Sequence, residues 1–535
     1  MSNKITRRQL VQTGLGVGLG GLVKSGLSGA AGAAVGWAVL PARLLRAYAA
    51  NEKVQVALIG VGGRGRWFVE TIPKMADLVA LCDVNDLKVE ETFRFLDETS
   101  RRWADSPHPW ERQAAEIYRR LAEKKPPVFA DFRKMLQEMG AKIDAVVVAT
   151  PDHTHAVASA AAIRSGKHVF CEKPLTRTVH ESRTLRDLAR QYKVATAMGN
   201  QGTYSGPFRR ALELIRTGAL GQIREVYIWN DAGGADRREP PKGEMPVPKH
   251  LHWDLWLGPA AYRPFHSDWL NRNLWREFGT GQLGNWASHT ANLAFMALEV
   301  HRLWSAEAVS APAEQSGAAK PSASADASAP AAAGRSVLPG AGQTPSASAP
   351  PKIRIRAETS GVNRLSFPRW EKVYWEIPAR GKWPPITFQW LNGPAPGLEE
   401  LLKPIMQDAP EKQRGLWHFA GTLIVGEKGS IHTTGHNMWF RLLPADRFTG
   451  VQTERPETVP ASRGPEQDWL AACRGGEAPW SQFDYAAALN EFLMLGNIAT
   501  QFEQPIEYDP LAMKITNLPE ADQLLRSEYR PGWSL

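Results

Sequence analysis

The chain has 535 residues, of which 43% are hydrophobic, and this is enough for two domains of ordinary size with buried cores. Its formal net charge of +9 would favour a nucleic-acid partner, but the first 49 residues contain six basic residues and no acid, and the remainder has no basic stripe interleaved with aromatic residues. Nucleic acid is therefore not a predicted partner, and three widely spaced cysteines without a CxxC pair predict neither a disulfide framework nor a cysteine metal site.

Residues 1–49 are predicted to be an export signal rather than part of the folded protein. Arg7 and Arg8 precede a glycine- and alanine-rich, weakly apolar stretch over residues 14–40, which is typical of bacterial twin-arginine signals. A small-x-small sequence predicts cleavage after Ala49, and an uncleaved membrane anchor is the alternative. The signal leads us to expect that the processed protein is periplasmic. Because no other apolar run approaches about 20 residues, we also expect it to lack a membrane span.

The first predicted strand, residues 53–59, is a β-branched apolar run of the kind found in buried parallel strands. It leads into a G-x-G-x-x-G sequence that starts at Gly60 and precedes a predicted helix over residues 66–75. In such a sequence the first glycine permits a tight turn, the second lets the backbone approach a pyrophosphate, and the third, Gly65, lets helix and strand pack closely. Strand, glycines and helix in that order predict a dinucleotide site, and a purely structural β-α-β unit is the alternative.

A second predicted strand, residues 78–82, ends in Asp83, which lies 23 residues after Gly60. A carboxylate at the end of this strand can accept hydrogen bonds from the ribose hydroxyls of an adenine dinucleotide. The same carboxylate would repel a 2′-phosphate, so the sequence favours NAD over NADP.

The alternation of strands and helices continues and predicts an α/β Rossmann domain, a doubly wound parallel sheet, over residues 50–200. Further strands are expected near Val128 and at residues 144–149, 168–171 and 194–198, and helices at residues 132–139, 155–165 and 179–192. Residues 94–125 exceed the length that a simple crossover needs, so one or two additional surface helices are expected there.

Several motifs along the chain closely resemble the glucose-fructose oxidoreductase / inositol dehydrogenase (Gfo/Idh/MocA) family. They are the sequences at residues 149–155 (ATPDHTH), 172–174 (EKP), 198–202, 253–259, 281–289, 426–429 and 528–533. The resemblance covers about residues 52–310 and 352–535, and its later motifs are similar to an exported, signal-bearing branch of the family. It implies a sugar or cyclitol dehydrogenase with NAD as cofactor.

The resemblance implies that Lys173 lies beside the nicotinamide and hydrogen-bonds the reacting hydroxyl. An ammonium at a strand end can polarise an alkoxide and can have a lowered pKa. The following Pro174 can adopt a cis peptide bond that fixes the direction of the lysine. A solvated lysine is the alternative.

The family also uses a D-x-x-x-H pattern on a helix, and a spacing of four would place both side chains on one helical face. Here His289 matches the catalytic histidine, but Asn285 stands where an aspartate is usual, and Asn292 replaces a frequent acid. An amide can orient a substrate hydroxyl but can neither take its proton nor stabilise an imidazolium by charge. The predicted catalytic residues are therefore Lys173, His289 and Asn285, and a satisfied core histidine is the alternative for His289.

The glycine sequence and the resemblance together predict which residues bind the cofactor. They are Gly60, Gly62, Gly63, Arg64, Gly65, Asp83, Thr150, Pro151, His155, Glu172, Lys173 and Asn200. His153 and His155 form an H-x-H pair, but no acid or cysteine cluster accompanies it, so no metal site is predicted.

After residue 200 the pattern changes to that of an α+β domain. Alternating or apolar runs predict strands at residues 222–229, 372–377, 386–390, 422–425 and 438–443. They indicate an open, mostly antiparallel sheet over residues 201–310 and 352–480, and the resemblance implies that one face forms a subunit interface, so a homo-oligomer is predicted. A Ser/Ala/Pro/Gly tract over residues 311–351 is predicted to be a disordered insertion. Residues 481–535 are expected to form a helix and tail, and the resemblance implies that this helix packs on the first domain.

Three functions are compatible with the sequence. The first is an NAD-dependent oxidoreductase that transfers hydride from a CH–OH group of a sugar, sugar acid or cyclitol to nicotinamide, with His289 as acid/base and Lys173 polarising the oxygen. The second is an enzyme without net redox change, in which tightly bound NAD oxidises a sugar transiently so that a glycoside is cleaved or a centre epimerised. The third is a catalytically weakened sugar- or nucleotide-binding protein, suggested by Asn285 and Asn292. The identity of the sugar does not follow from the fold.

Overall fold

Both predicted sheets are present in the computed structural model, which describes residues 53–305, 351–407 and 414–535. The predicted export signal over residues 1–49 lies outside the described residues, as does the predicted insertion over residues 311–351 apart from its last residue. Among the described residues, no helix combines the length and the apolar character that crossing a bilayer requires.

In the described part of the chain, the first sheet contains six strands, all parallel, in the order β3-β2-β1-β4-β5-β6. The strands are β1 (Gln55–Ile59), β2 (Asp77–Cys82), β3 (Val128–Phe129), β4 (Ala145–Val148), β5 (His168–Cys171) and β6 (Thr196–Met198). Every residue of β4 and β5 is buried, because a parallel sheet is covered by helices on both faces. The sheet confirms the predicted doubly wound Rossmann fold.

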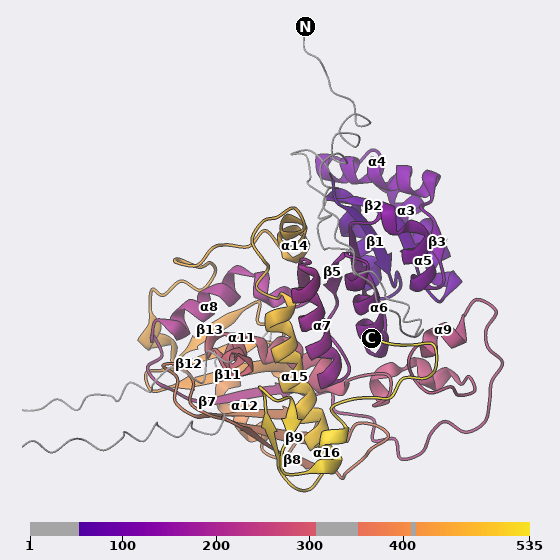
Figure 1. Ribbon diagram of the computed structural model, residues 1–535. Helices are drawn as coiled ribbons and strands as arrows, with labels where there is room; N and C mark the ends of the chain where they lie inside the picture. The colour runs from indigo at the N-terminus through magenta and orange to yellow at the C-terminus, as the bar shows by residue number, and fades with distance from the viewer. Residues whose placement is uncertain (1–52, 306–350, 408–413) are drawn as a thin grey trace, which may run out of the picture. The chain divides into compact units, whose positions relative to one another are not determined.

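Helices cover the first sheet and form its crossovers (Figure 1). They are α2 (Gly65–Thr71), α3 (Asp86–Trp103), α4 (Pro109–Lys124), α5 (Phe132–Met139), α6 (Asp152–Arg164) and α7 (Val179–Tyr192). Of these, α3 and α4 pack on each other through amphipathic faces, and the Tyr118 hydroxyl of α4 donates to the Glu70 carbonyl oxygen 2.8 Å away. The additional helix expected within residues 94–125 is α4, whereas α3 is the crossover helix itself and is capped at its start by Asn85.

The second sheet has the strand order β13-β12-β11-β7-β10-β9-β8-β14-β15 in the described residues. Its strands are β7 (Ile223–Asn230), β8 (Ile353–Thr359), β9 (Glu371–Ile377), β10 (Ile386–Asn392), β11 (Ala420–Gly426), β12 (Ser430–Thr434), β13 (Phe440–Leu443), β14 (Ile506–Asp509) and β15 (Lys514–Ile515). Neighbouring strands are antiparallel except β7 and β10, which are parallel. The sheet is thus mixed but mostly antiparallel, as predicted.

The remaining helices vary in length. They are α8 (Gly206–Arg216), α9 (Trp253–Leu257), α10 (Ser288–Thr290), α11 (Asn292–Ala297), α12 (Leu398–Met406), α13 (Arg414–Phe419), α14 (Pro465–Cys473), α15 (Phe483–Ala499) and α16 (Pro519–Gln523). One of them, α14, lies against β5 and β6 of the first sheet although the sequence places it in the second domain. Apart from Asp484 in its first turn, α15 is buried, because it packs against α7 on one side and β8 and β9 on another (Figure 1). Phe492 of this helix stacks on Trp375 of β9, with ring centroids 4.5 Å apart. Through α15 the two sheets share one hydrophobic core.

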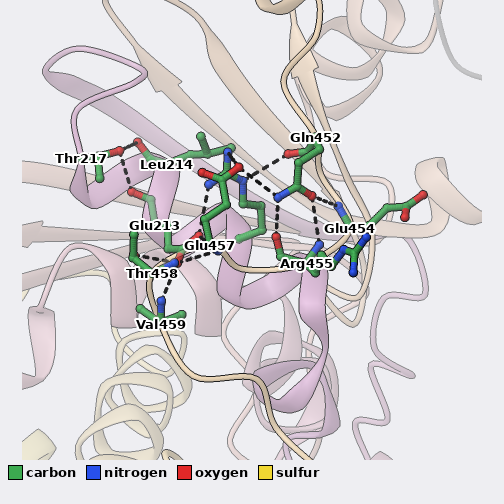
Figure 2. A network of polar contacts seen from close by, with 10 residues as sticks. Glu213, Leu214, Thr217, Gln452, Glu454, Arg455, Glu457, Thr458 and Val459 are labelled. Carbon is green, nitrogen blue, oxygen red and sulfur yellow. Dashed lines mark hydrogen bonds and ion pairs between the residues drawn. The ribbon is translucent and has the colours of Figure 1, made fainter.

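A polar network fastens the segment before α14 to α8 (Figure 2). The carboxylate of Glu213, near the end of α8, accepts the backbone N–H groups of Glu457, Thr458 and Val459 and the Thr458 hydroxyl. Arg210 of the same helix also donates to this carboxylate, at 3.2 Å. Burial opposes ionisation of Glu213, but the donors outweigh it and lower its pKa to about 2.

Candidate active site

The loop between β1 and α2 has a backbone path that requires its glycines. Gly60 has a φ of 88°, and a Cβ there would lie 2.5 Å from the Ala149 carbonyl oxygen. A Cβ at Gly65 would lie 2.1 Å from the Gly60 carbonyl oxygen, because α2 starts directly against the end of β1. A Cβ at Gly63 would meet nothing within 4 Å, so the backbone at this position faces open space.

Asp83 lies at the carboxyl end of β2 and binds the same loop. Its carboxylate accepts the N–H of Val61 at 2.8 Å and that of Asn85 at 2.9 Å. Burial raises the pKa of Asp83 above its ordinary value, although these backbone donors oppose the change. The residue lines a cavity of about 290 Å³ whose walls are mostly apolar and include Phe132 and Leu251. An apolar cavity with one carboxylate suits a flat ring joined to a group that bears hydroxyls.

A second cavity, of about 510 Å³, adjoins the first where both are lined by Gly62, Ala149, Thr150 and Pro151. It lies at the carboxyl ends of the parallel strands, where open α/β sheets bind their ligands. The predicted site residues that line it are Gly62, Gly63, Arg64, Thr150, Pro151, His155, Glu172, Lys173, Asn285 and His289. Four further residues line this cavity but are not predicted as site residues from the sequence: Ala149, Gln201, Arg272 and His436.

Lys173 follows β5 and reaches across this cavity to the second domain. Its peptide bond with Pro174 is cis. The ammonium donates to the Asn285 carbonyl oxygen at 2.8 Å and to Asn285 Oδ1 at 2.9 Å. Burial lowers the pKa of Lys173 to about 8, although the charges of Glu172 and Asp152 oppose this. A charged lysine has three hydrogens, so one donor is left for a ligand.

The segment that carries Asn285 and His289 differs from the expected α-helix. Leu283–Ala287 form a π-helical turn, and α10 follows it. The physical reason is that the Lys173 ammonium bonds to the Asn285 carbonyl oxygen, and a side chain inserted into the helix ladder widens it. Asn285 and His289 both line the second cavity. They do so from a π-helical turn and the helix after it, and not by a spacing of four on one α-helix.

His289 is buried, and its Nδ1 has no hydrogen-bond partner among the described residues. Burial lowers the pKa of His289 well below its ordinary value, and the positive charge of Lys173 adds to the effect. The imidazole is therefore neutral at pH 7 and has a free nitrogen.

Glu172 forms the acidic part of the cavity wall. One of its oxygens lies 2.9 Å from Arg64 Nε, and the other accepts the N–H of Lys173 at 3.1 Å. A Cβ at Gly199 would lie 2.6 Å from this carboxylate, so the close approach requires glycine. The next residue, Asn200, is fully buried and lines neither cavity, although the sequence predicts it as a cofactor ligand.

The two histidines of the H-x-H sequence bond to different backbone carbonyl groups. His155 contacts the carbonyl oxygens of Thr150 and Pro174, each at 2.8 Å. His153 contacts the Trp256 carbonyl oxygen at 2.8 Å. Both rings therefore order the backbone around the site, and the described residues contain no cluster of three or more histidine, cysteine or acidic side chains placed to hold a metal.

An ion pair that sequence reasoning misses closes one side of the cavity. Arg272 Nε lies 3.2 Å from the carboxylate of Asp152, which also accepts the Thr280 hydroxyl at 2.7 Å. Burial opposes ionisation of Asp152, but Arg272 and other nearby groups hold its pKa below the ordinary value. Asp152 lies within the motif at residues 149–155 and could have been found there, whereas Arg272 begins a short 3-10 helix, Arg272–Leu274, that no sequence motif marks.

His436 is the other residue that the sequence does not single out. It lies in the turn between β12 and β13, and its ring centroid is 4.6 Å from that of His289 and 5.1 Å from that of Trp286. Burial lowers its pKa below the ordinary value, and the positive charges of Lys173 and Arg64 contribute. Its only sequence signal is its place in a polar stretch just before the strand predicted at residues 438–443.

Comparison with known proteins agrees with the geometry of the first domain. Residues 54–200 match the model of a family described as "Oxidoreductase family, NAD-binding Rossmann fold" (GFO_IDH_MocA). The chain is 31% identical over 229 residues to "Glycosyl hydrolase family 109 protein" of Saccharopolyspora erythraea, which covers 42% of this chain and 45% of that protein. It is 29% identical over 135 residues to levoglucosan dehydrogenase of Pseudarthrobacter phenanthrenivorans, which covers 22% and 34%. The chain thus matches less than half the length of either relative.

Two solved structures are similar over most of the chain at low sequence identity. Aldose-aldose oxidoreductase from Caulobacter crescentus, complexed with glycerol, has a TM-score of 0.48 and 13% identity and covers 85% of this chain and 100% of that one. The WlbA dehydrogenase from Bordetella pertussis, in complex with NADH and UDP-GlcNAcA, has a TM-score of 0.46 and 14% identity and covers 85% and 98%.

Proposed function

We propose that the protein is an NAD-dependent oxidoreductase that acts on a CH–OH group of a sugar, sugar acid or cyclitol, since residues 54–200 match the model of the Gfo/Idh/MocA oxidoreductases with an NAD-binding Rossmann fold. The observation that carries the proposal is the reach of Lys173 Nζ across the second cavity to Asn285. This contact places a donor of lowered pKa beside the open backbone of the glycine loop, where hydride chemistry needs one.

The residues present fit the cofactor. The first cavity would take the adenosine, with its ribose hydroxyls against Asp83, and the adjoining second cavity would take the nicotinamide. Gly62 lines both cavities, and the open backbone at Gly63 and the guanidinium of Arg64 follow it in the wall of the second, where a pyrophosphate would need donors. NAD held in this way would supply the acceptor for the hydride.

The residues of the chain divide the remaining work. The neutral amine of Lys173, whose pKa of about 8 lies near neutral pH, can keep its two hydrogens on the Asn285 oxygens and take the hydroxyl proton on its lone pair. The ammonium formed in this way then has a third hydrogen to donate to the substrate oxygen. The sequence assigns the acid/base role to His289, but burial and the nearby Lys173 charge disfavour its imidazolium, and Asn285 brings no negative charge to stabilise one. We therefore assign proton transfer from the hydroxyl to Lys173 and orientation of the substrate to His289 and Asn285.

A direct test screens purified protein and NAD against a panel of neutral sugars, sugar acids and cyclitols. The absorbance of reduced nicotinamide should rise with at least one member of the panel. Lys173→Met is the matched negative variant, and Lys142→Met, which changes an exposed lysine, is the control. If the native protein binds NAD but the absorbance of reduced nicotinamide rises with no member of the panel, the proposal is contradicted.

A second candidate is a reaction without net redox change, in which NAD is reduced and reoxidised within one catalytic cycle. The observation in its favour is the second histidine, His436, in the same cavity, because alcohol oxidation alone does not need it. The similarity to a glycosyl hydrolase family 109 protein is in keeping with this candidate. Cleavage or epimerisation of a sugar with no accumulation of reduced NAD would support it over the first.

Export and self-association belong to the proposal as well. Arg7 and Arg8, with the glycine-rich stretch after them, support export by the twin-arginine route, and an R7K/R8K chain should then stay in the cytoplasm. The resemblance to a family whose second sheet often forms a subunit interface supports a homo-oligomer. Light scattering of the processed protein should accordingly give a mass of at least twice that of one chain.

A further inference from the structure

We propose that the protein has a further binding site, separate from the candidate active site, for a small organic molecule that carries phosphate or carboxylate groups. The site is a cavity of about 360 Å³ lined by parts of α7, of α15 and of the C-terminal tail, and is called the arginine cavity below. Four arginines line it: Arg177, Arg276, Arg364 and Arg526. None of the residues around it lines either cavity of the candidate active site, so the inference does not depend on the proposed function.

The four arginines of this cavity have no carboxylate partners. Within the described residues, their side chains contact carbonyl oxygens, hydroxyl groups and aromatic rings, and no ion pair joins any of them to an acid. Largely buried arginines elsewhere in the chain do form ion pairs: Arg183, Arg210, Arg263 and Arg530. Since charges removed from water are normally paired, four unpaired guanidinium groups around one cavity indicate a ligand of opposite charge.

Arg276 is fixed in the cavity wall by neutral groups. Its guanidinium nitrogens donate over 2.8 to 3.1 Å to three carbonyl oxygens and one hydroxyl, those of Asn363, Ser366, Asn497 and Thr500. Burial lowers the pKa of Arg276 to about 10, and Glu371 opposes this through its charge without forming an ion pair. The guanidinium is therefore charged at neutral pH, in a position that its neighbours hold constant.

Arg177, in the loop before α7, is only partly satisfied. It donates to the Arg276 carbonyl oxygen at 3.3 Å and to the Ser527 hydroxyl at 2.6 Å, and its buried Nε has no partner among the described residues. Arg364 and Arg526 are exposed and line the same cavity, so their donors can turn toward a ligand.

The acidic residues of the cavity do not balance these charges. Two glutamates line it, and Glu277 is already bound to the Ala261 N–H and to the guanidinium of Arg263. The other, Glu528, is exposed and forms no ion pair in the part of the chain that the structure describes. A cavity wall with excess positive charge raises the local concentration of anions.

The composition of the wall indicates the class of anion. Guanidinium groups present planar pairs of N–H donors that match the oxygens of carboxylate and phosphate groups. Apolar side chains lie between the arginines, among them Val179, Phe367, Met494 and Ile498, and these can contact carbon atoms of a ligand. The cavity therefore suits an organic molecule with anionic groups better than a bare inorganic ion.

The arginine cavity also lies where it can affect the candidate active site. Arg177 stands four positions after Lys173, and Arg276 stands nine positions before Asn285. The contact between Arg177 and the Arg276 carbonyl oxygen joins these two segments. An anion bound by both guanidinium groups would strengthen this connection, so binding should stabilise the folded protein.

Titration calorimetry of the purified protein at constant ionic strength tests the inference with two probes, glycerol phosphate and citrate, and with glycerol as the uncharged control. At least one of the two anions should bind saturably at one site per chain and raise the melting temperature, and glycerol should do neither. Tighter binding of glycerol phosphate would assign a phosphate ligand, and tighter binding of citrate would assign a carboxylate ligand.

The variants locate the site. Arg364→Met and Arg526→Met each remove one exposed guanidinium and should weaken binding of the better probe about tenfold, and about 100-fold when combined. Arg164→Met removes an exposed arginine at the end of α6 that does not line the cavity, and this control should bind the probe as the native protein does.

Two results would overturn the inference. One is the absence of saturable binding of either anion to the native protein. The other is equal affinity of the native protein, Arg364→Met and Arg526→Met, because the anion would then bind elsewhere, as at the glycine loop after β1. If one variant has a lowered melting temperature without probe, the other decides. Failure to bind NAD would contradict the proposed function alone, since neither probe is a dinucleotide.

Discussion

Two buried polar clusters of this molecule are built in opposite ways. In the network on α8, the carboxylate of Glu213 receives donors from three successive backbone N–H groups and a hydroxyl (Figure 2). In the second cavity, His289 Nδ1 has no partner among the described residues, and Lys173 has only the two oxygens of Asn285. Both clusters hold an ionisable side chain out of water, so burial alone does not separate structure from function.

What separates them is the direction of the pKa and its cause. Backbone donors lower the pKa of Glu213 to about 2 against the effect of burial, so the charged form is the stable one and stays charged. Burial lowers the pKa of Lys173 to about 8, which brings the neutral amine within reach of ordinary pH. A satisfied charge stabilises a fold, whereas an incompletely satisfied one is available for proton transfer.

The largest expected effect is on turnover. Lys173→Met should lower kcat about 10³-fold with the sugar found in the panel, because it removes both the donor to the substrate oxygen and the proton acceptor. The thermal stability should hardly change, since the amine is only partly satisfied in the native protein. Steady-state kinetics and differential scanning calorimetry measure the two quantities. A fall of less than tenfold would show that another group does this chemistry.

In the network on α8, the opposite outcome is expected: a loss of stability without a loss of turnover. Glu213→Gln should lower the free energy of unfolding by about 3 kcal/mol, because backbone N–H groups that now bond to a carboxylate would face a neutral amide. Turnover per folded molecule should be unchanged. Glu427→Gln, which removes an exposed surface ion pair with Arg224, is the matched control and should cost less than about 1 kcal/mol. Equal losses in the two variants would contradict the account.

The same glutamate should give stability a specific pH dependence. Its ordinary pKa of 4.5, expected in the unfolded chain, falls to about 2 in the folded one. The stabilisation from ionised Glu213 is therefore fully present above about pH 4.5 and is lost as the pH falls toward 2, by about 3 kcal/mol in all. Denaturant titrations between pH 6 and pH 2 should show the native protein and Glu213→Gln converging. Curves that stay parallel would show that the carboxylate is not held by its donors.

The smallest effect is expected from a change that gives Lys173 a charged partner, so that its charge is satisfied as that of Glu213 is. Asn285→Asp would place a carboxylate 2.9 Å from the Lys173 ammonium and should raise its pKa by about one unit. Because the neutral amine is the active form, the rising limb of the pH–rate profile should move to higher pH by the same amount. Activity that appears only in the variant would instead favour the catalytically weakened binding protein.

The sequence predicts those elements whose ends are set locally. The helices expected at residues 132–139 and 179–192 are found at those bounds as α5 and α7. Their starts are coded by neighbouring residues: Asp131 caps α5, and Thr178 with Glu181 forms a capping box at α7. Lys173 and His289 are likewise found in one cavity, because each lies in a motif that can be recognised without knowledge of the fold.

The parts that the sequence does not predict depend on contacts between distant segments. The π-helical turn at Leu283–Ala287 arises where Lys173, 112 positions away from Asn285, bonds to the helix backbone. Arg272 reaches the cavity from a short 3-10 helix and His436 from a turn, and only the packing of the second domain brings these segments near it. Asn200 stands in a recognisable motif, but its side chain is buried and lines neither cavity, whereas the next residue, Gln201, lines the second.

The proposed function requires that the two adjoining cavities hold one NAD molecule along the carboxyl ends of the first sheet. Titration calorimetry of the processed protein, freed of any bound nucleotide, tests this most directly. We expect saturable binding of NAD at one site per chain, weakened in Asp83→Ala, which removes the carboxylate facing the ribose. A native protein that binds neither oxidised nor reduced NAD would contradict the account.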